Sequence, residues 1–106
     1  MQSERRNSPR FPIEQFLDVS YTREKYIKAS GINISANGML CELESPVEPY
    51  SKIYILLDLK DKKDPIEIEG IIIRIEKSGK RYRAGVEFSE LYSEDKTRLK
   101  KFIKSL

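Results

Sequence analysis

The clearest structural signal is residues 53–59, IYILLDL, in which apolar side chains occupy every second position. Successive side chains of a β-strand point to opposite faces, so this alternation indicates a strand with one buried face. The segments on either side, SPVEP at 45–49 and KDKKDP at 60–65, carry turn and loop signals. The side chains on the predicted buried face are Ile53, Ile55, Leu57 and Leu59.

Similar runs lie on both sides of this strand, separated by polar or glycine-containing turns such as Ser78-Gly79. Short antiparallel strands at this spacing favour a small barrel. The predicted strands are 13–21, 26–34, 39–44, 53–59, 66–75 and 82–88.

In 66–75 the apolar phase changes after Gly70, as a β-bulge at that glycine would produce. We therefore expect Ile71, Ile73 and Ile75 to face the core. Ile72 and Arg74 are expected to face the other way.

The last fourteen residues predict an amphipathic helix. Ser93 is a plausible N-cap, and the acidic residues after it suit the positive end of the helix dipole. The fold class is therefore mainly β: a six-stranded antiparallel β-barrel with a C-terminal α-helix that plugs or flanks an open end. The apolar stripe of the helix is Leu99, Phe102, Ile103 and Leu106.

Composition limits the possible functions. The chain has 106 residues, enough for one domain with a modest core, and a net charge of +3. No apolar run approaches the roughly 20 residues that span a bilayer, and the polar N-terminus is not a secretory signal, so a cytoplasmic location without membrane contact is expected.

Histidine is absent and Cys41 is the only cysteine, interpreted as a buried core thiol. A histidine-based nucleophile is thereby excluded, and the single cysteine argues against a zinc site, so we expect no enzyme, metal or cofactor.

Two short stretches suggest binding chemistry. The first is a flexible N-terminal arm, residues 1–12, which precedes the barrel domain at 13–106. Its arginines are Arg5, Arg6 and Arg10, and Pro9 and Pro12 are expected to keep it out of regular structure. A guanidinium can grip a phosphate with two hydrogen bonds, bind the O6 and N7 edge of guanine, or stack on its ring.

The second stretch is the turn NISANG at 33–38. Asn33 offers an acceptor for guanine N–H groups, and Ser35 can donate to a phosphate oxygen. Gly38 permits positive φ and a close backbone approach. From the residues alone, a solvated basic tail and a plain polar turn remain open as alternatives.

Together these stretches resemble the signature of the PilZ domain family, R-x-x-x-R on the arm and [DN]-x-S-x-x-G after the second strand. Here they are RNSPR at 6–10 and NISANG at 33–38, and YRAGVEF at 82–88 resembles the family's late Gly-Val-x-Phe strand. The likeness extends over about residues 4–105. It implies a six-stranded barrel with a C-terminal helix and the binding of cyclic di-GMP.

The resemblance also assigns roles. Arg6 and Arg10 would bind phosphates and guanine edges, Asn33 a guanine, Ser35 a phosphate, and Gly38 would shape the turn. Many members have Asp at position 33, and the chain has no tryptophan to stack on a base. In this family an arginine at the position of Arg5 tends to accompany two stacked ligand molecules, so two per protomer are expected.

The leading hypothesis is a stand-alone receptor for cyclic di-GMP. Because the arm starts at the N-terminus of the chain, the output is expected to pass through a separate partner protein or self-association. The basic face of the helix is one candidate contact surface. Two alternatives are a small basic barrel that binds nucleic acid through Tyr26, Tyr54 and Tyr82, which the modest charge disfavours, and a PilZ-like interaction module that binds no nucleotide.

Overall fold

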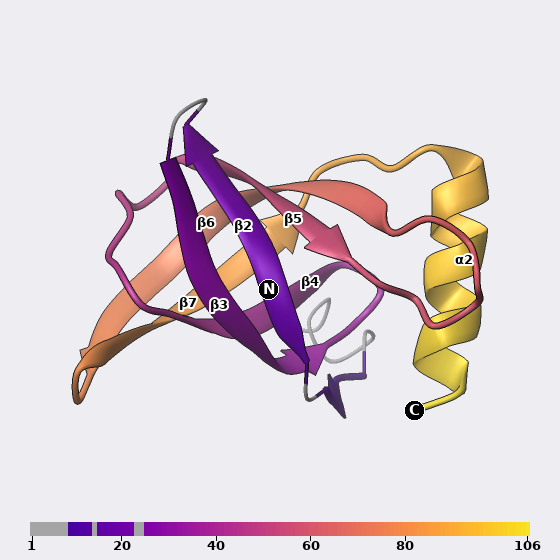
Figure 1. Ribbon diagram of the computed structural model, residues 1–106, viewed down its shortest axis with the longest axis horizontal. Coiled ribbons are helices and arrows are strands. Elements are labelled where there is room, and N and C mark those ends of the chain that lie inside the picture. The colour runs from indigo at the N-terminus through magenta and orange to yellow at the C-terminus, as the bar shows by residue number, and fades with distance from the viewer. Residues whose placement is uncertain (1–8, 14, 23–24) are drawn as a thin grey trace, which may run out of the picture.

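The computed structural model describes residues 9–13, 15–22 and 25–106. Its strands pair antiparallel in the order β1-β3-β2-β5-β6-β7-β4. Because β3 also pairs with β4, the strands from β2 to β7 close into a six-stranded barrel, with β1 added beside β3 (Figure 1). The predicted fold class is thus confirmed. The elements are β1 Phe11–Pro12, β2 Phe16–Thr22, β3 Lys25–Ile34, β4 Gly38–Leu43, β5 Lys52–Leu57, β6 Ile66–Ser78, β7 Arg81–Phe88 and α2 Ser93–Lys104.

The barrel interior is filled by the apolar side chains that the alternation selects. Every predicted inward residue of 53–59 is buried, and Cys41 lies in the same core. Burial raises the pKa of the Cys41 thiol to about 12, because a thiolate would have to leave water. The largest fully buried side chains are Ile34, Met39, Leu43, Ile53, Ile55, Leu57, Ile68, Ile72 and Leu99.

The bulge in β6 differs from the sequence-based prediction. The alternation of core-facing positions continues unchanged through Gly70 to Ile72, which is fully buried, whereas Ile73 is 43% exposed. The register shift against β7 falls between Ile72 and Arg74, so Ile73 is the inserted residue. Gly70 is needed for another reason: a Cβ there would stand 2.5 Å from the Val86 side chain.

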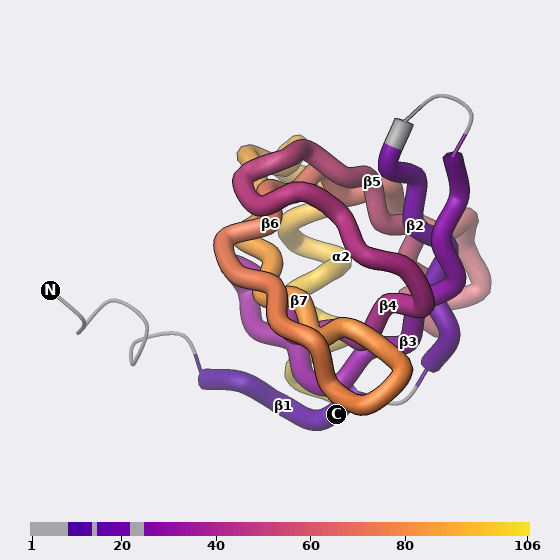
Figure 2. Tube along the Cα trace, turned by 90° about the vertical axis from the view of Figure 1, so that its left-hand side faces the viewer, coloured from indigo at the N-terminus to yellow at the C-terminus, as the bar shows by residue number. Residues whose placement is uncertain are grey.

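The helix α2 lies across one end of the barrel. Figure 2 looks along the barrel from the opposite end, with α2 behind the strands. Leu99, Phe102 and Ile103 are buried as predicted, but Leu106 is 47% exposed because the helix ends at Lys104. Across the described ranges, no helix has the length and apolar character that crossing a membrane requires.

The predicted N-cap is also wrong by one residue. The cap position is held by Tyr92, which makes no side-chain capping hydrogen bond, and Ser93 is the first residue of the helix. The Ser93 carbonyl accepts a hydrogen bond from the Thr97 hydroxyl.

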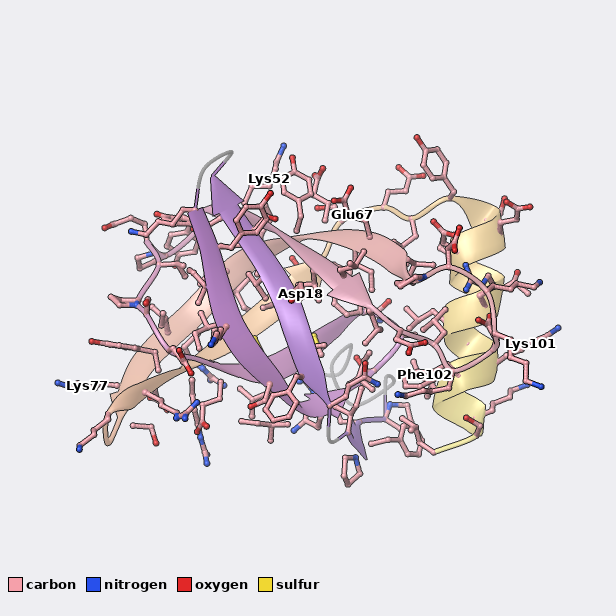
Figure 3. All side chains as sticks on the ribbon, viewed as in Figure 1. Asp18, Lys52, Glu67, Lys77, Lys101 and Phe102 are labelled. Atoms are coloured by element: carbon pink, nitrogen blue, oxygen red, sulfur yellow. The ribbon has the colours of Figure 1, made fainter. Side chains whose placement is uncertain are left out.

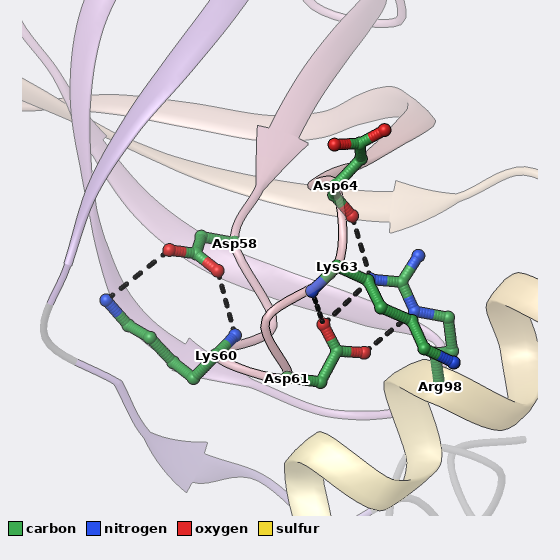
Figure 4. Close-up of polar contacts among 6 residues, drawn as sticks. All are labelled: Asp58, Lys60, Asp61, Lys63, Asp64 and Arg98. Atoms are coloured by element: carbon green, nitrogen blue, oxygen red, sulfur yellow. Dashed lines mark hydrogen bonds and ion pairs between the residues drawn. The ribbon is translucent and has the colours of Figure 1, made fainter.

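An ion pair fixes α2 to the loop between β5 and β6 (Figure 4). Arg98 donates from Nε and Nη2 to the two carboxylate oxygens of Asp61, over 2.8 and 2.9 Å, and from Nη2 to the Asp64 carbonyl over 2.8 Å. The hydrogen bonds from Arg98 lower the pKa of Asp61 to about 2. This contact orients the helix against the barrel end.

Candidate functional site

The turn between β3 and β4 is held together by Ser35. Its amide donates to the Gly38 carbonyl over 2.8 Å, and its hydroxyl donates to the same oxygen over 3.3 Å. The hydroxyl oxygen also accepts from the Asn37 amide. Ser35 is only 2% exposed, so the hydroxyl expected to reach a phosphate is engaged inside the turn. In this structure Ser35 gives the turn its shape.

Gly38 is required by a close approach rather than by its φ angle. Among the described glycines, only Gly79 has positive φ. A Cβ on Gly38 would collide with the carbonyl oxygen of Val86 on β7. The glycine therefore lets the end of the turn lie directly against the neighbouring strand.

The arm meets the turn through β1. The expectation that residues 1–12 stay irregular does not hold for Phe11–Pro12, which pair with β3 so that Pro12 lies opposite Asn33. This pairing brings Arg10 to Asn33, and Arg10 Nη1 donates to Asn33 Oδ1 over 3.1 Å. Two side chains that are 23 positions apart in sequence thus share one surface. Arg5 and Arg6 lie outside the described residues.

A row of outward-facing residues crosses the barrel surface from Asn33. The register places Asn33, Leu40, Gly85 and Arg74 in one row across β3, β4, β7 and β6. Gly85 has no side chain, so the row has an open position between Leu40 and the exposed Arg74 at its far end. Such a row suits a planar ring carrying anionic groups, because guanidiniums stand near both ends.

Comparison with known proteins places the chain in a family. The family model of the PilZ domain matches residues 4–105. The chain belongs to the PilZ domain family. No curated protein matches it in sequence.

Three solved structures share the fold of this PilZ domain. The inhibitor of motility MotI (DgrA) of Bacillus subtilis is similar with a TM-score of 0.74 and 19% identity, over 92% of this chain and 49% of that one. The K. pneumonia MrkH–c-di-GMP complex has a TM-score of 0.72 and 14% identity, over 91% of this chain and 49% of that one. YcgR of Escherichia coli in complex with c-di-GMP has a TM-score of 0.74 and 14% identity, over 95% of this chain and 45% of that one. The chain spans about half the length of these proteins.

The geometry of this PilZ domain brings together most of the predicted site. Arg10 and Asn33 are in contact, and Ser35 and Gly38 build the turn beside them. Sequence analysis did not find this row, because Arg74 is placed opposite Gly85 only by the bulge at Ile73. Gly85 within an otherwise regular strand was the available signal.

The aromatic side chains considered for nucleic-acid stacking lie elsewhere. Tyr82 is half-buried and packs against the core of the PilZ domain. Tyr26 and Tyr54 line an outer hollow together with Asp18 and Glu67. Two carboxylates beside the rings would repel a phosphate backbone, which argues against this alternative.

Proposed function

We propose that this PilZ domain binds cyclic di-GMP and transmits the binding event to a partner protein. The observation that carries the proposal is the hydrogen bond between Arg10 and Asn33, which joins the arm motif to the turn motif. The complexes of MrkH and YcgR with c-di-GMP support the choice of ligand. The proposed role is binding, not catalysis, in the cytoplasm, where a bacterial second messenger would act.

Each residue has a distinct role in this proposal. The Arg10 guanidinium would bind a phosphate or a guanine edge, and the Asn33 amide would hydrogen-bond a guanine. Ser35 and Gly38 would hold the turn in the conformation that presents Asn33. Arg6 would add a second guanidinium from the arm, which ligand binding would order across the barrel.

Isothermal titration calorimetry with cyclic di-GMP tests this proposal. We expect saturable binding by the wild-type protein, weakened about tenfold or more in Arg10→Ala and in Asn33→Ala, because each change removes a hydrogen-bonding group. Arg83→Ala is the matched control, since Arg83 is an exposed arginine on β7 outside the predicted site. Circular dichroism verifies that each variant is folded. Absence of binding by the wild-type protein would overturn the proposal and favour an interaction module without nucleotide.

The same titration tests the proposed stoichiometry. Arg5 would stack on a second, base-stacked ligand, so the wild-type protein is expected to bind two molecules per protomer. The variant Arg5→Leu is expected to bind one. A wild-type stoichiometry near one would refute the role of Arg5 and leave the proposed receptor function intact.

A further inference from the structure

A hollow of about 400 Å³ opens on the outer face of the barrel, over β2, β3, β5 and β6. We call it the tyrosine hollow. Its size is in the range of sites that hold small organic groups. It is lined by Asp18, Val19, Ser20, Tyr26, Tyr54, Leu56 and Glu67.

Two tyrosines line the tyrosine hollow from strands on either side of β2. Ser20 lies directly opposite Tyr26 on β3 and directly opposite Tyr54 on β5. Because neighbouring strands are about 4.8 Å apart, the two tyrosines arise about 10 Å from each other, with a small serine between them. A planar group in contact with both rings needs about 7 Å, at about 3.5 Å to each ring. Rings that stand perpendicular to the sheet at this spacing would leave room for one flat group between them.

The charges of the tyrosine hollow are negative. The adjacent row consists of Lys28, Asp18, Leu56 and Glu67 across β3, β2, β5 and β6, and Figure 3 labels its two acidic residues. Both acidic residues are exposed, and the ion pairs found among the described residues do not include either of them. None of the lining residues is basic, although the chain as a whole carries a net charge of +3. The lining of the hollow is thus negative on a basic protein, and Lys28 is the basic side chain opposite Asp18 at its edge.

We propose that the tyrosine hollow is a docking site for an arginine side chain of a partner protein. The guanidinium would lie between Tyr26 and Tyr54 as a cation against aromatic faces, and its fork of N–H donors would pair with the carboxylates of Asp18 and Glu67. Arginine suits this hollow better than lysine because its cation is planar and stacks on aromatic rings. Tyr26 is 74% exposed, so the site is open to a second protein.

The tyrosine hollow is separate from the proposed nucleotide site. Both use β3, but Tyr26 and Asn33 are seven residues apart on this strand, which corresponds to about 24 Å. Occupation of one site would therefore leave the other accessible. The docking proposal does not depend on cyclic di-GMP binding.

The test uses the peptide acetyl-Gly-Arg-Gly-amide and ¹H–¹⁵N NMR spectra of the whole protein. We expect saturable chemical-shift changes at residues 18–20 and 54–56, and none with the corresponding citrulline peptide, which has the same shape without the charge. Equal shifts with citrulline, or equal affinity for the lysine peptide, would overturn the proposal. Shifts spread over all acidic surfaces of the protein would also overturn it.

Variants separate the roles of ring and charge. The double variant Asp18→Asn, Glu67→Gln is expected to bind the arginine peptide about fivefold more weakly, because two exposed ionic contacts are lost. Tyr26→Ala is expected to weaken binding similarly, whereas Tyr26→Phe retains the ring and the affinity. Glu90→Gln removes an exposed carboxylate elsewhere and is the matched control. Unchanged binding in the double variant would refute the assignment.

Discussion

Replacement of Gly38 by alanine tests the packing of the turn against β7. A Cβ at this position would stand closer than 3.0 Å to the carbonyl oxygen of Val86, and 3.4 Å from its carbonyl carbon. That backbone has little freedom to move, because Val86 pairs with Met39 on one side and with Ile72 on the other. We therefore expect Gly38→Ala to separate the turn from β7 and to lower the free energy of unfolding.

The expected loss follows from opposing contributions. Forced overpacking costs about 1–3 kcal/mol, and displacement of the Gly38 carbonyl weakens hydrogen bonds from Ser35 that contribute about 1 kcal/mol each. Alanine restricts the unfolded chain, which offsets about 0.4–1 kcal/mol. The net loss is about 2 kcal/mol, and for a domain of this size it corresponds to a Tm lower by about 10 °C.

Thermal unfolding followed by circular dichroism measures this effect. Gly85→Ala is the matched control, since a Cβ there would meet its nearest neighbours at 3.7 and 3.9 Å, which is ordinary contact. Its Tm is expected to equal or slightly exceed that of the wild-type protein. A Tm for Gly38→Ala within about 2 °C of wild type, or an equal loss in both variants, would refute the reasoning.

Further predictions concern the helix and the core. Arg98 lowers the pKa of Asp61 from 3.8, the value expected in the unfolded chain, to about 2 in the folded protein. The ion pair therefore contributes its full stabilisation above the unfolded pKa, and this contribution is lost as the pH falls through about 2. In urea unfolding, the wild-type protein should have a higher free energy of unfolding than Asp61→Asn at pH 5, and the difference should shrink towards pH 2. A difference that stays constant with pH would show that it does not come from the ionised Asp61 carboxylate. Cys41 is buried with its pKa raised to about 12, so Ellman's reagent at pH 8 should modify it only in denaturant, and rapid labelling of the folded protein would be inconsistent with its burial. In urea unfolding, Leu99→Ala should lower the free energy of unfolding by about 2–5 kcal/mol, because Leu99 is buried, and the exposed Leu106→Ala by less than about 0.5 kcal/mol. Equal losses in the two variants would contradict the packing of α2 against the barrel.

Sequence patterns predicted the barrel because several of its strands alternate between core and solvent, as residues 53–59 show. The bulge was misplaced because a glycine in a strand can mark either a bulge or a close approach, and Gly70 marks the approach of Val86. Three successive isoleucines, 71–73, concealed which residue was inserted. Apolar identity alone could not distinguish the inserted side chain from its buried neighbour.

The candidate site was predictable where its contacts are local. The polar turn at 33–38 follows from short-range chemistry, since Ser35 bonds to groups within three residues. The contact between Arg10 and Asn33 depends on the pairing of β1 with β3, which involves residues far apart in sequence. Such pairings are set by the whole fold, so only the family resemblance could connect the two stretches beforehand.

The closure of the barrel has a kinetic consequence. β4 pairs with β7, and the partners Leu40 and Gly85 are separated by more than forty positions in the chain. Ordering such a long loop has an entropic cost before the ladder forms, so barrels of this kind fold slowly, typically in milliseconds to seconds. Gly38 belongs to this ladder, so the turn at 33–38 reaches its position against β7 only when this long-range pair has formed.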